Sequence, residues 1–548
     1  MKEKIIDKLK VIGIILALTF IVSIPYLNYS NVFVHDISYH TNRIIAISEE
    51  LKNGQFPVSI HSNLVNGFGY ANSLFYPELF IYIPAILMIL GIDIFTSYKI
   101  LIIITTFFTF LFTYYSANRM FKNKNITWMI TLLYGCAFYR LTDIYARGAI
   151  GEVLALTFLP LILSGLYEII FGENEKWWII CFGIFGVINS HILSFAMIII
   201  LILLIIVINI KKIFKDKKRL INLIIAGTIS ILLICSFVFT YLEQTANDKF
   251  NVDEKIYNGA FLKSYSVSLV ELINNKFYKG DFYKGIGTIL LILPMLILKC
   301  KNKNNENKFM NQIFVLGMIL LCMTTSLFPW EKICEKFDFI TTIQFPYRFN
   351  IIITLLFSFV GGYAICNVFY NKEEVINLSY ILFILFTITL ISSVQIGYDQ
   401  LTQEEIIAFA PIGNAEYLPY GFNSQDNKVH NIKNEEEIKF TRKSTKLEFY
   451  YENTEDEMII HIPLTYYKGY VAYIENDGTK TEICVSKDEQ TKNVIVSNDE
   501  ILTGKITVEY KMTVIQKAGY IITYVTLLSL TIYVCYKEYK IKKQTLVN

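Results

Sequence analysis

The feature that most constrains this chain is a series of long apolar runs along most of its length. A helix needs roughly 20 apolar residues to cross the hydrocarbon core of a membrane. Of the 548 residues, 54% are hydrophobic and only 18% are charged, whereas a soluble domain carries about 25% charged residues. The sequence therefore predicts an all-α polytopic membrane protein with about twelve transmembrane helices. The runs are 10–28, 97–118, 125–140, 150–171, 177–190, 191–210, 220–241, 284–300, 309–328, 345–368, 376–396 and 518–536.

Positive charge in the short loops predicts the orientation of these spans. Loops rich in lysine and arginine stay in the cytoplasm, and with twelve spans every basic loop falls on one side. The apolar stretch 76–90 contains Pro77 and Pro84, and counting it as a span would place residues 119–124 outside. We therefore expect a juxtamembrane or re-entrant helix there, both termini in the cytoplasm, and a first span that is an anchor and not a cleaved signal peptide. The basic loops are 1–10, 119–124, 211–219, 299–308 and 537–543.

Three segments on the predicted outer side are too long to be simple turns. The third alternates apolar and polar residues in short stretches, with a turn at Asn476-Asp477-Gly478. Alternation with a period of two indicates strands with one buried face, so we expect an extracytoplasmic all-β, sandwich-like domain before the last helix. The predicted parts are a transmembrane domain at 1–396 with outer loops 28–98 and 243–284, the β domain at 397–517, and the last helix with a basic cytoplasmic tail at 518–548.

Charge and cysteine content exclude several classes of function. The net charge is only +3 and the lysines lie in short loops, so we expect no nucleic-acid partner. The nine cysteines are scattered and lack the paired spacing of a metal knuckle or a disulfide framework. We therefore expect neither a cofactor nor a metal site.

Arginine is rare and occurs where positive charge is least expected. Seven of the 50 basic residues are arginine, and Arg43, Arg140, Arg147 and Arg348 occupy outer loops or the outer ends of spans. Arginine presents a planar fork that binds phosphate or carboxylate through two hydrogen bonds. One such arginine is most simply paired with a lipid headgroup or a nearby carboxylate. Four on one side make a shared anionic ligand an equal alternative.

The first outer loop contains a carboxylate, two rings and a cation at helical spacing. If this stretch is helical, Asp36, Tyr39, His40 and Arg43 share one face at positions i, i+3, i+4 and i+7. Asp36 is then a candidate catalytic base, and it is equally a candidate N-cap of the helix. One residue can fill both roles.

Further polar residues occur at other outer positions. Residues 139–152 combine arginines and acids with glycines that let the backbone approach a ligand closely. Arg147 and Glu152 are equally explained as a structural ion pair, and His191, between two apolar runs, is more simply a kink residue. The candidate substrate-binding residues are Tyr39, His40, Arg43, Arg140, Asp143, Arg147, Glu152, His191, Gln344 and Arg348.

Several short motifs follow one another in a fixed order. They are Asp36-x-x-Tyr39-His40-x-x-Arg43, Gly54-x-Phe56-Pro57, Gly67-Phe68-Gly69-Tyr70, Phe75-Tyr76-Pro77, Tyr145-x-Arg147-Gly148-x-x-x-Glu152, Gln344-Phe345-Pro346-Tyr347-Arg348, Glu416-Tyr417-Leu418-Pro419 and Tyr466-Tyr467-Lys468-Gly469-Tyr470. Over most of its length the chain resembles bacterial membrane proteins labelled 6-pyruvoyl-tetrahydropterin-synthase-related, which are similar to YfhO-type proteins and to the wider GT-C glycosyltransferases. The zinc-binding histidines of the soluble pterin enzyme have no counterpart, so we do not expect that activity.

The GT-C resemblance implies a glycosyltransferase at the outer face of the cell membrane, with a polyprenyl-phosphate-linked sugar as donor and a cell-envelope polymer or lipid as acceptor. It also implies that an acidic residue of the first outer loop, here Asp36, acts on the acceptor. An acceptor hydroxyl needs a base within hydrogen-bond reach, and the departing phosphate needs fixed positive charge. Several GT-C enzymes carry two adjacent acidic residues, whereas the neighbour of Asp36 is His35, so we expect metal-independent transfer.

Two other classes of function are compatible with the sequence. A transporter or flippase of lipid-linked sugars would have broken helices and charged residues near the midplane of the membrane, whereas the polar residues here gather at one face. A non-catalytic envelope scaffold that binds cell-wall polymer through its β domain would need neither Asp36 nor Arg147.

The predicted topology is testable with a cysteine introduced at Asp216, in the basic loop 211–219. Because basic loops are retained in the cytoplasm, an impermeant thiol reagent should label this cysteine only after the cells are opened. Cys484, in the predicted outer domain, is the positive control. Labelling at position 216 in intact cells would reverse the orientation and move the polar residues to the other side.

Overall fold

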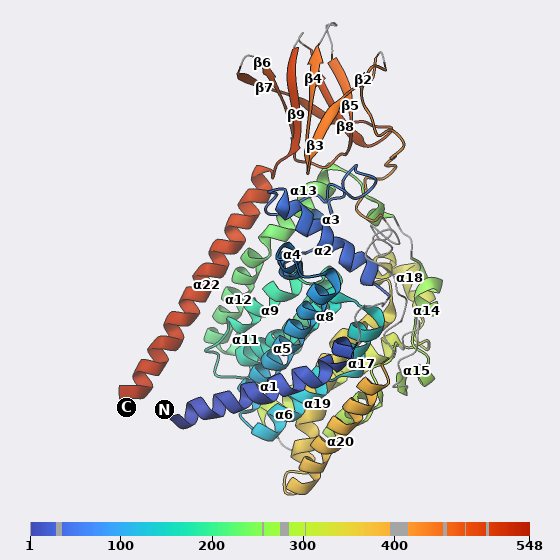
Figure 1. Ribbon diagram of the computed structural model, residues 1–548. Coiled ribbons are helices and arrows are strands. Elements are labelled where there is room, and N and C mark those ends of the chain that lie inside the picture. The colour runs from blue at the N-terminus through green and yellow to red at the C-terminus, as the bar shows by residue number, and fades with distance from the viewer. Residues whose placement is uncertain are drawn as a thin grey trace.

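The computed structural model shows a body of helices with a β-sheet at one end (Figure 1). The last helix, α22 (Val514–Val547), leaves the sheet and runs along the outside of the body. The structure describes residues 2–547 apart from 29–34, 255–256, 274–283, 302, 395–414, 434, 453–457, 477 and 500–502. The predicted start of the β domain at 397 and Asp477 of the predicted turn therefore lie outside the described residues.

The helices identify a multi-pass membrane protein, but the prediction of about twelve spans is not confirmed. Among the described residues, seven helices are long and apolar enough to cross a membrane. An eighth span is possible if α12 (Lys217–Leu233) and α13 (Cys235–Asn247), which are bent by 57°, count as one. The seven helices are Ile6–Leu27, Ile94–Phe121, Ile150–Ile170, Asn305–Thr324, Pro346–Val368, Glu373–Ser392 and Val514–Ile541.

The other four predicted spans form shorter helices. They are α6 (Lys124–Gly135), α9 (Ile179–Ile188), α10 (Ile192–Ile208) and the pair α16 (Thr288–Ile292) and η4 (Leu293–Lys299). Hydropathy counts apolar residues, but it does not show where packing ends a helix. Between α9 and α10, for example, the His191 ring accepts a hydrogen bond from the Ser194 amide and so begins a new helix.

Helix α8 (Ile150–Ile170) lies at the centre of the helical body, with 94% of its apolar window buried. A Cβ on Gly165 would come within 2.5 Å of the Ile180 amide nitrogen, and one on Gly183 within 2.9 Å of the Ile162 amide nitrogen. Small residues thus let the backbones of α8 and α9 pack directly against each other, as is typical of helix pairs in membranes. The second half of α8 is therefore held by close packing on a neighbouring helix.

The first outer segment folds into α2 (Ile37–Lys52), α3 (Asn72–Phe75), η1 (Leu79–Ile81) and α4 (Tyr82–Ile89). The stretch predicted to be a juxtamembrane or re-entrant helix is a short apolar helix, too short to be counted as a span. Helix α4 packs against α2 and against α5 (Ile94–Phe121). This packing holds the beginning of α2 above the end of the helical body.

The β domain is one antiparallel sheet in the order β2-β1-β5-β8-β7-β6-β9-β4-β3. The edge strand β2 also contacts β4 near the opposite edge, so the sheet almost closes on itself. The expected all-β domain is present, but the two faces of the predicted sandwich belong to one curled sheet. The strands are β1 (Val429–Asn431), β2 (Glu437–Ile438), β3 (Phe440–Lys443), β4 (Lys446–Glu452), β5 (Met458–Thr465), β6 (Tyr470–Asn476), β7 (Thr479–Lys487), β8 (Asn493–Asn498) and β9 (Thr503–Tyr510).

Aromatic packing seats the sheet on the helical body. Phe75 stacks on Tyr417 with ring centroids 5.2 Å apart and packs edge-on against Phe250 at 4.5 Å. Arg442 of β3 also donates to the backbone oxygens of Ser62 and Gly67 in the first outer segment. The sheet and this segment therefore share one core.

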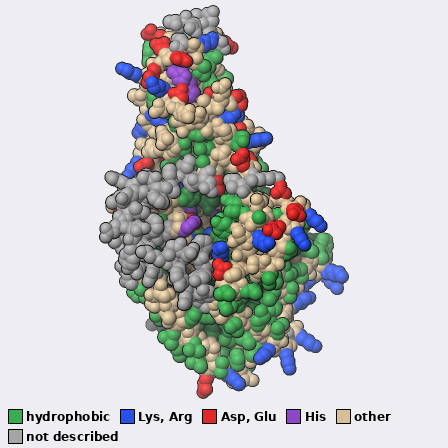
Figure 2. Space-filling model, turned by 90° about the vertical axis from the view of Figure 1, so that its right-hand side faces the viewer, with side chains coloured by type: hydrophobic (Ala, Val, Ile, Leu, Met, Phe, Trp, Pro, Cys, Tyr) green, Lys and Arg blue, Asp and Glu red, His purple; other side chains and the backbone are tan. Residues whose placement is uncertain are grey.

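The two ends of the molecule differ in character. Both termini lie at the end of the helical body away from the sheet (Figure 1). Lysine and arginine side chains project from that same end, below a largely apolar surface (Figure 2). This arrangement matches the predicted clustering of basic loops, while the side of the membrane that they face stays a prediction.

Candidate functional site

Four segments bring the main candidate residues together beneath the sheet. Asp36 immediately precedes α2, and Arg147 ends η2 (Asp143–Arg147), which follows α7 (Phe138–Thr142). Glu152 lies in the first turn of α8, and Arg348 lies in η6 (Pro346–Phe349) directly before α19 (Asn350–Val368). Figure 2 shows a hollow below the sheet where histidine and charged side chains reach the surface.

Glu152 is the centre of a buried ion-pair network. Its Oε1 accepts hydrogen bonds from Nη2 of Arg147 at 3.0 Å and from Nε of Arg348 at 3.3 Å. Its Oε2 accepts from Nη1 of Arg147 at 2.7 Å and from the hydroxyl of Tyr139 at 3.0 Å. Glu152 is only 2% exposed. The structural ion pair that the sequence left open for Arg147 and Glu152 is therefore present, and it includes Arg348 as well.

Most of the hydrogen bonds that the Arg147 guanidinium can donate go to other side chains of the protein. Its Nη1 also donates to Oδ1 of Asp143 at 2.5 Å, and its guanidinium lies 5.3 Å from the centre of the Tyr347 ring. Gly148 has a φ of +68°, which glycine adopts without strain, and this reversal turns the chain from η2 into α8. The same turn brings Arg147 back onto Glu152.

Asp36 is held beside Arg147 by the backbone. The Asp36 amide donates to the Arg147 carbonyl at 2.7 Å, and the His35 amide donates to the Ala146 carbonyl at 3.3 Å. Asp36 occupies the N-cap position of α2, yet its side chain makes no capping hydrogen bond. Its Oδ1 instead pairs with Nδ1 of His35 at 2.9 Å, and 36% of the side chain is exposed. The carboxylate is thus fixed in position but remains accessible.

The ionisation of Asp36 reflects this position. Burial alone would raise the pKa of Asp36, but the hydrogen bond from His35 and the positive charge of Arg147 outweigh it. The pKa of Asp36 therefore lies below its usual value. The carboxylate is ionised at neutral pH and can accept a proton or a hydrogen bond.

Arg348 has one donor group that faces no protein acceptor among the described residues. Its Nη1 donates to the side-chain oxygen of Gln344 and to the Ile343 carbonyl, and its Nε donates to Glu152. Within the described part of the chain, Nη2 has no hydrogen-bond acceptor, and 11% of the side chain is exposed. Gln344 has a φ of +64° and ends η5 (Asp338–Ile343), so a strained turn aims its amide at Arg348.

Tyr76 and His191 complete the cluster. A Cβ on Gly151 would come within 2.5 Å of the Tyr76 hydroxyl and 3.1 Å of the His191 ring, so only glycine lets these side chains reach the start of α8. The charges of Arg43, Arg348, Glu152 and Asp36 all act on the Tyr76 hydroxyl. Tyr76 stands in one of the sequence motifs, but nothing in its local sequence shows which helix it meets.

Arg43, His40 and Tyr39 belong to a neighbouring network, which contacts the first cluster where the Arg43 guanidinium lies 4.6 Å from the centre of the Tyr76 ring. Arg43 is 2% exposed, and it donates to Glu78 at 3.0 Å and to the Pro77 carbonyl, with His40 at 3.2 Å. The Tyr39 hydroxyl donates to Asn72 at 2.7 Å. These contacts join α2 to α3 and to the turn before η1, so the guanidinium of Arg43 is bonded to the protein.

Sequence reasoning missed the carboxylate at the centre of this second network. Burial alone would raise the pKa of Glu78, but His61 and Arg43 outweigh this effect and hold it at about 2. Ser73, Asn72 and His61 all bond the same carboxylate. Glu78 is thus a buried anion with a full set of donors.

Arg140 lies inside the helical body, away from the cluster. Its Nη1 donates to the Gly135 carbonyl and its Nη2 to Thr106, each at 2.9 Å, and the residue is fully buried. Of the two alternatives that the sequence left open for the four arginines, pairing with groups of the protein describes Arg43 and Arg140, while Arg147 and Arg348 share Glu152. Arg43 pairs with Glu78, whereas Arg140 donates to a carbonyl and to threonine hydroxyls, and its buried Nε has no hydrogen-bond partner among the described residues.

In the described part of the chain, the cluster around Glu152 does not have the arrangement of a metal site. Among the described residues, the group of three or more histidine, cysteine or acidic side chains spaced to hold a metal ion lies in the β-sheet. The expectation of metal-independent chemistry at Asp36 stays a prediction.

Comparison with known proteins gives distant similarities. A family described as "Domain of unknown function (DUF6311)" matches residues 94–344, which is less than half of the chain. An uncharacterized protein of Lactococcus lactis subsp. cremoris (strain MG1363) is 22% identical over 335 residues, which cover 58% of this chain and 54% of the relative. The chain thus spans about half the length of this curated relative.

A solved structure is also similar. The cryo-EM structure of arabinofuranosyltransferase AftD from Mycobacteria is 12% identical and has a TM-score of 0.40, over 70% of this chain and 27% of that chain. These comparisons do not confirm the resemblance to YfhO-type or pterin-synthase-related proteins. We therefore derive a function from the cluster itself.

The ion-pair network predicts a large stability effect at Glu152. Glu152→Gln leaves the Arg348 guanidinium without its counter-charge and leaves Asp143 as the anion that still pairs with Arg147. Breaking a buried ion pair costs roughly 3–5 kcal/mol. We expect a clearly lower Tm for the variant purified in detergent. Glu173→Gln is the matched control, because Glu173 pairs with Lys122 and is 60% exposed, so its Tm should barely change. Equal Tm values for both variants would show that the network does not hold the fold.

Proposed function

We propose that this chain is a membrane glycosyltransferase that uses a polyprenyl-phosphate-linked sugar to modify a hydroxyl of a cell-envelope polymer or lipid at the outer face. The observation that carries the proposal is the placement of one accessible carboxylate beside Arg147, whose partner Glu152 also accepts from Arg348. Asp36 is fixed by backbone bonds to the Arg147 segment. Arg348, joined to Arg147 through Glu152, keeps one donor group without an acceptor among the described residues.

Asp36 and Arg348 have different roles in the proposed sugar transfer, one toward the acceptor hydroxyl and one toward the departing phosphate. Asp36 accepts the proton of the acceptor hydroxyl while that oxygen forms a bond to the anomeric carbon of the donor sugar. The bond between the anomeric carbon and the phosphate oxygen breaks, and its electron pair leaves with the polyprenyl phosphate. Arg348 stabilises the negative charge that develops on this phosphate. The proton and the leaving group are thus handled by different residues.

Arg147 has a positioning role in this scheme. Its guanidinium is engaged by Glu152, Asp143 and Tyr139, which leaves little of its fork for a ligand. Its carbonyl holds the Asp36 amide, and its charge helps to keep the Asp36 carboxylate ionised. Phosphate binding therefore falls to Arg348, whose Nη2 points at no acceptor in the described part of the chain.

The low pKa of Asp36 sets the pH range of the base. An ordinary aspartate titrates near 3.9, and the pKa of Asp36 lies below its usual value. As the pH falls, the ionised form is lost only when the pH passes this lowered pKa. Activity that depends on Asp36 should therefore persist throughout the mildly acidic range.

A transporter is less well supported by the arrangement of the helices. The break between α12 and α13 falls at Ile234, next to Leu233 and Cys235, and α13 packs there against α22. Transporters of the broken-helix type use such breaks to bind substrate or ions. Here the charged cluster lies at the start of α8 and not at the break, which favours chemistry at one end of the helical body.

Replacing Asp36 by asparagine separates an enzyme from a scaffold. Asp36→Asn keeps the shape of the side chain but cannot accept a proton, so sugar transfer should fall to background while donor binding and Tm remain close to the original. Transfer is measured on purified protein in detergent with a polyprenyl-phosphate sugar. Asp499→Asn, at an exposed position just after β8, is the control and should keep full activity. Full activity of Asp36→Asn would remove Asp36 as the base.

Replacing Arg348 by lysine tests the phosphate contact. Arg348→Lys keeps the charge but loses the fork, and a charge-assisted hydrogen bond contributes about 1.5–3 kcal/mol. Because about 1.4 kcal/mol is a tenfold change, donor affinity should fall roughly tenfold or more. Arg119→Lys is the matched control, since Arg119 pairs with Glu168 at the far end of α5. Equal donor affinities for the two variants would exclude Arg348 from the phosphate site.

A further inference from the structure

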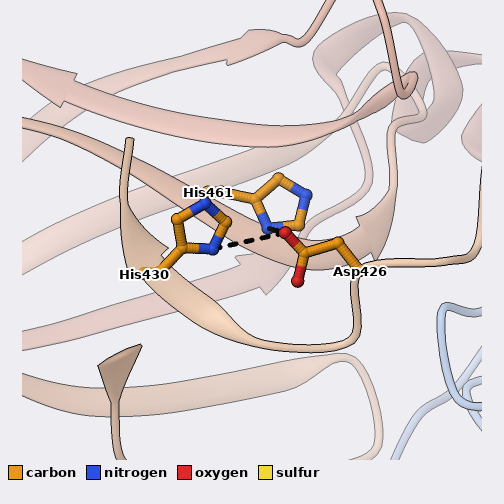
Figure 3. A group of neighbouring side chains, drawn as sticks. All are labelled: Asp426, His430 and His461. Atoms are coloured by element: carbon orange, nitrogen blue, oxygen red, sulfur yellow. Dashed lines mark ion pairs between the residues drawn. The ribbon is translucent and has the colours of Figure 1, made fainter. Parts of the chain in front are cut away.

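The β-sheet contains a second polar cluster, formed by Asp426, His430 and His461 (Figure 3). Oδ2 of Asp426 lies 3.4 Å from Nδ1 of His430 and 3.9 Å from Nδ1 of His461. One ligand atom from each residue lies within 4.8 Å of the other two. Two imidazole nitrogens and one carboxylate oxygen thus converge on one point.

The sheet itself creates this convergence. His430 of β1 and His461 of β5 are direct partners in the antiparallel register, so their side chains lie on the same face, with ring centroids 5.0 Å apart. Asp426 comes from the segment before β1, and its Oδ1 accepts a hydrogen bond from the Lys428 amide at 3.1 Å. His461 is buried, whereas Asp426 and His430 reach the surface. An ion can therefore enter from solvent and meet a fixed ligand behind it.

We propose that Asp426, His430 and His461 bind a divalent transition-metal ion, and that Zn²⁺ fits the site best. Neutral imidazole nitrogens and a carboxylate oxygen are typical zinc ligands. Zinc–nitrogen bonds of about 2.0–2.1 Å in a tetrahedral site separate the ligand atoms by roughly 3.3–3.5 Å. The 3.4 Å and 3.9 Å separations need only a small adjustment to reach this geometry.

Both ring nitrogens of His461 have hydrogen-bond partners, which an ion at Nδ1 would have to rearrange. Its Nδ1 lies 3.1 Å from the Lys428 carbonyl, and its Nε2 lies 3.1 Å from the amide nitrogen of Asn493. The side-chain oxygen of Asn493 is buried and has no hydrogen-bond partner among the described residues. An ion bound at Nδ1 would replace the proton that Nδ1 donates to the Lys428 carbonyl. Turning the Asn493 amide over would then let its oxygen accept a proton from Nε2, as the supporting partners of metal-bound histidines usually do, with loss of the 3.4 Å bond from its nitrogen to the Asn423 carbonyl.

A bound ion would fasten the edge of the sheet. Strand β1 has three residues and its neighbour β2 has two, so few backbone hydrogen bonds hold this edge. Asp426 and His430 belong to the edge, whereas His461 belongs to β5, which also pairs with β8. The ion would therefore link the edge strand and the segment before it to the interior of the sheet. This role is independent of the proposed sugar transfer.

The test uses the full chain in detergent, purified with a tag that contains no histidine and stripped with a chelator. Zn²⁺ is titrated against a chromophoric chelator, and bound metal is counted by mass spectrometry. We expect one high-affinity equivalent per chain. His430→Ala and Asp426→Asn should weaken binding by more than the roughly 10–100-fold that loss of a supporting partner of a ligand causes. Mg²⁺ and Ca²⁺, which prefer oxygen ligands, should not compete.

Glu482→Gln is the matched control, because Glu482 is exposed on β7 and its register partner is Tyr473 of β6, away from β1 and β5. It should bind Zn²⁺ like the original chain. The Tm of each variant without metal shows whether the substitution alone has damaged the fold, and His430 and Asp426 are exposed enough that we expect no change. The proposal is overturned if the original chain binds no Zn²⁺, or if folded His430→Ala binds it with unchanged affinity.

Discussion

The rest of the candidate site depends on the buried carboxylate of Glu152. It holds Arg147 through both of its oxygens and Arg348 through one, so a single anion joins the turn before α8 to the turn before α19. A buried ion pair is retained only when its charges are balanced and its hydrogen bonds are satisfied. Glu152 meets this condition because Tyr139 donates to it as well. The two arginines are therefore positioned before any ligand arrives.

The charged groups of the site are of two kinds. Some are buried and hold the site in place, and the others remain accessible to a ligand. Arg147, Glu152 and Asp143 are buried and bonded to one another. Asp36 and Arg348 lie at the edge of this network, and each keeps an accessible polar group. The rigid interior fixes their positions, as preorganised sites require. The second network, around Glu78 and Arg43, does the same for the beginning of α2.

The sequence predicted the kinds of secondary structure in this protein better than it predicted which residues would become neighbours in space. Apolar runs predicted the helices, but four of them end early, because capping and packing interrupt them where hydropathy does not change. Period-two alternation predicted the β domain, whereas the curled single sheet follows from the pairing of strands far apart in the chain. His430 and His461 stand 31 residues apart, so no local spacing marks them as neighbours, and only the register of β1 and β5 brings them together.

By itself, the sequence determined that the chain is a helical membrane protein with a β domain, and it singled out Asp36, Arg147, Glu152 and Arg348 as polar residues that apolar anchors do not need. These properties are local, since they depend on hydrophobicity, periodicity and residue type. Only the tertiary structure decided which arginines share a carboxylate and which are enclosed elsewhere. That choice depends on contacts between α2, α8 and α19, and Arg43 and Arg348 look alike until the partners of each guanidinium are known.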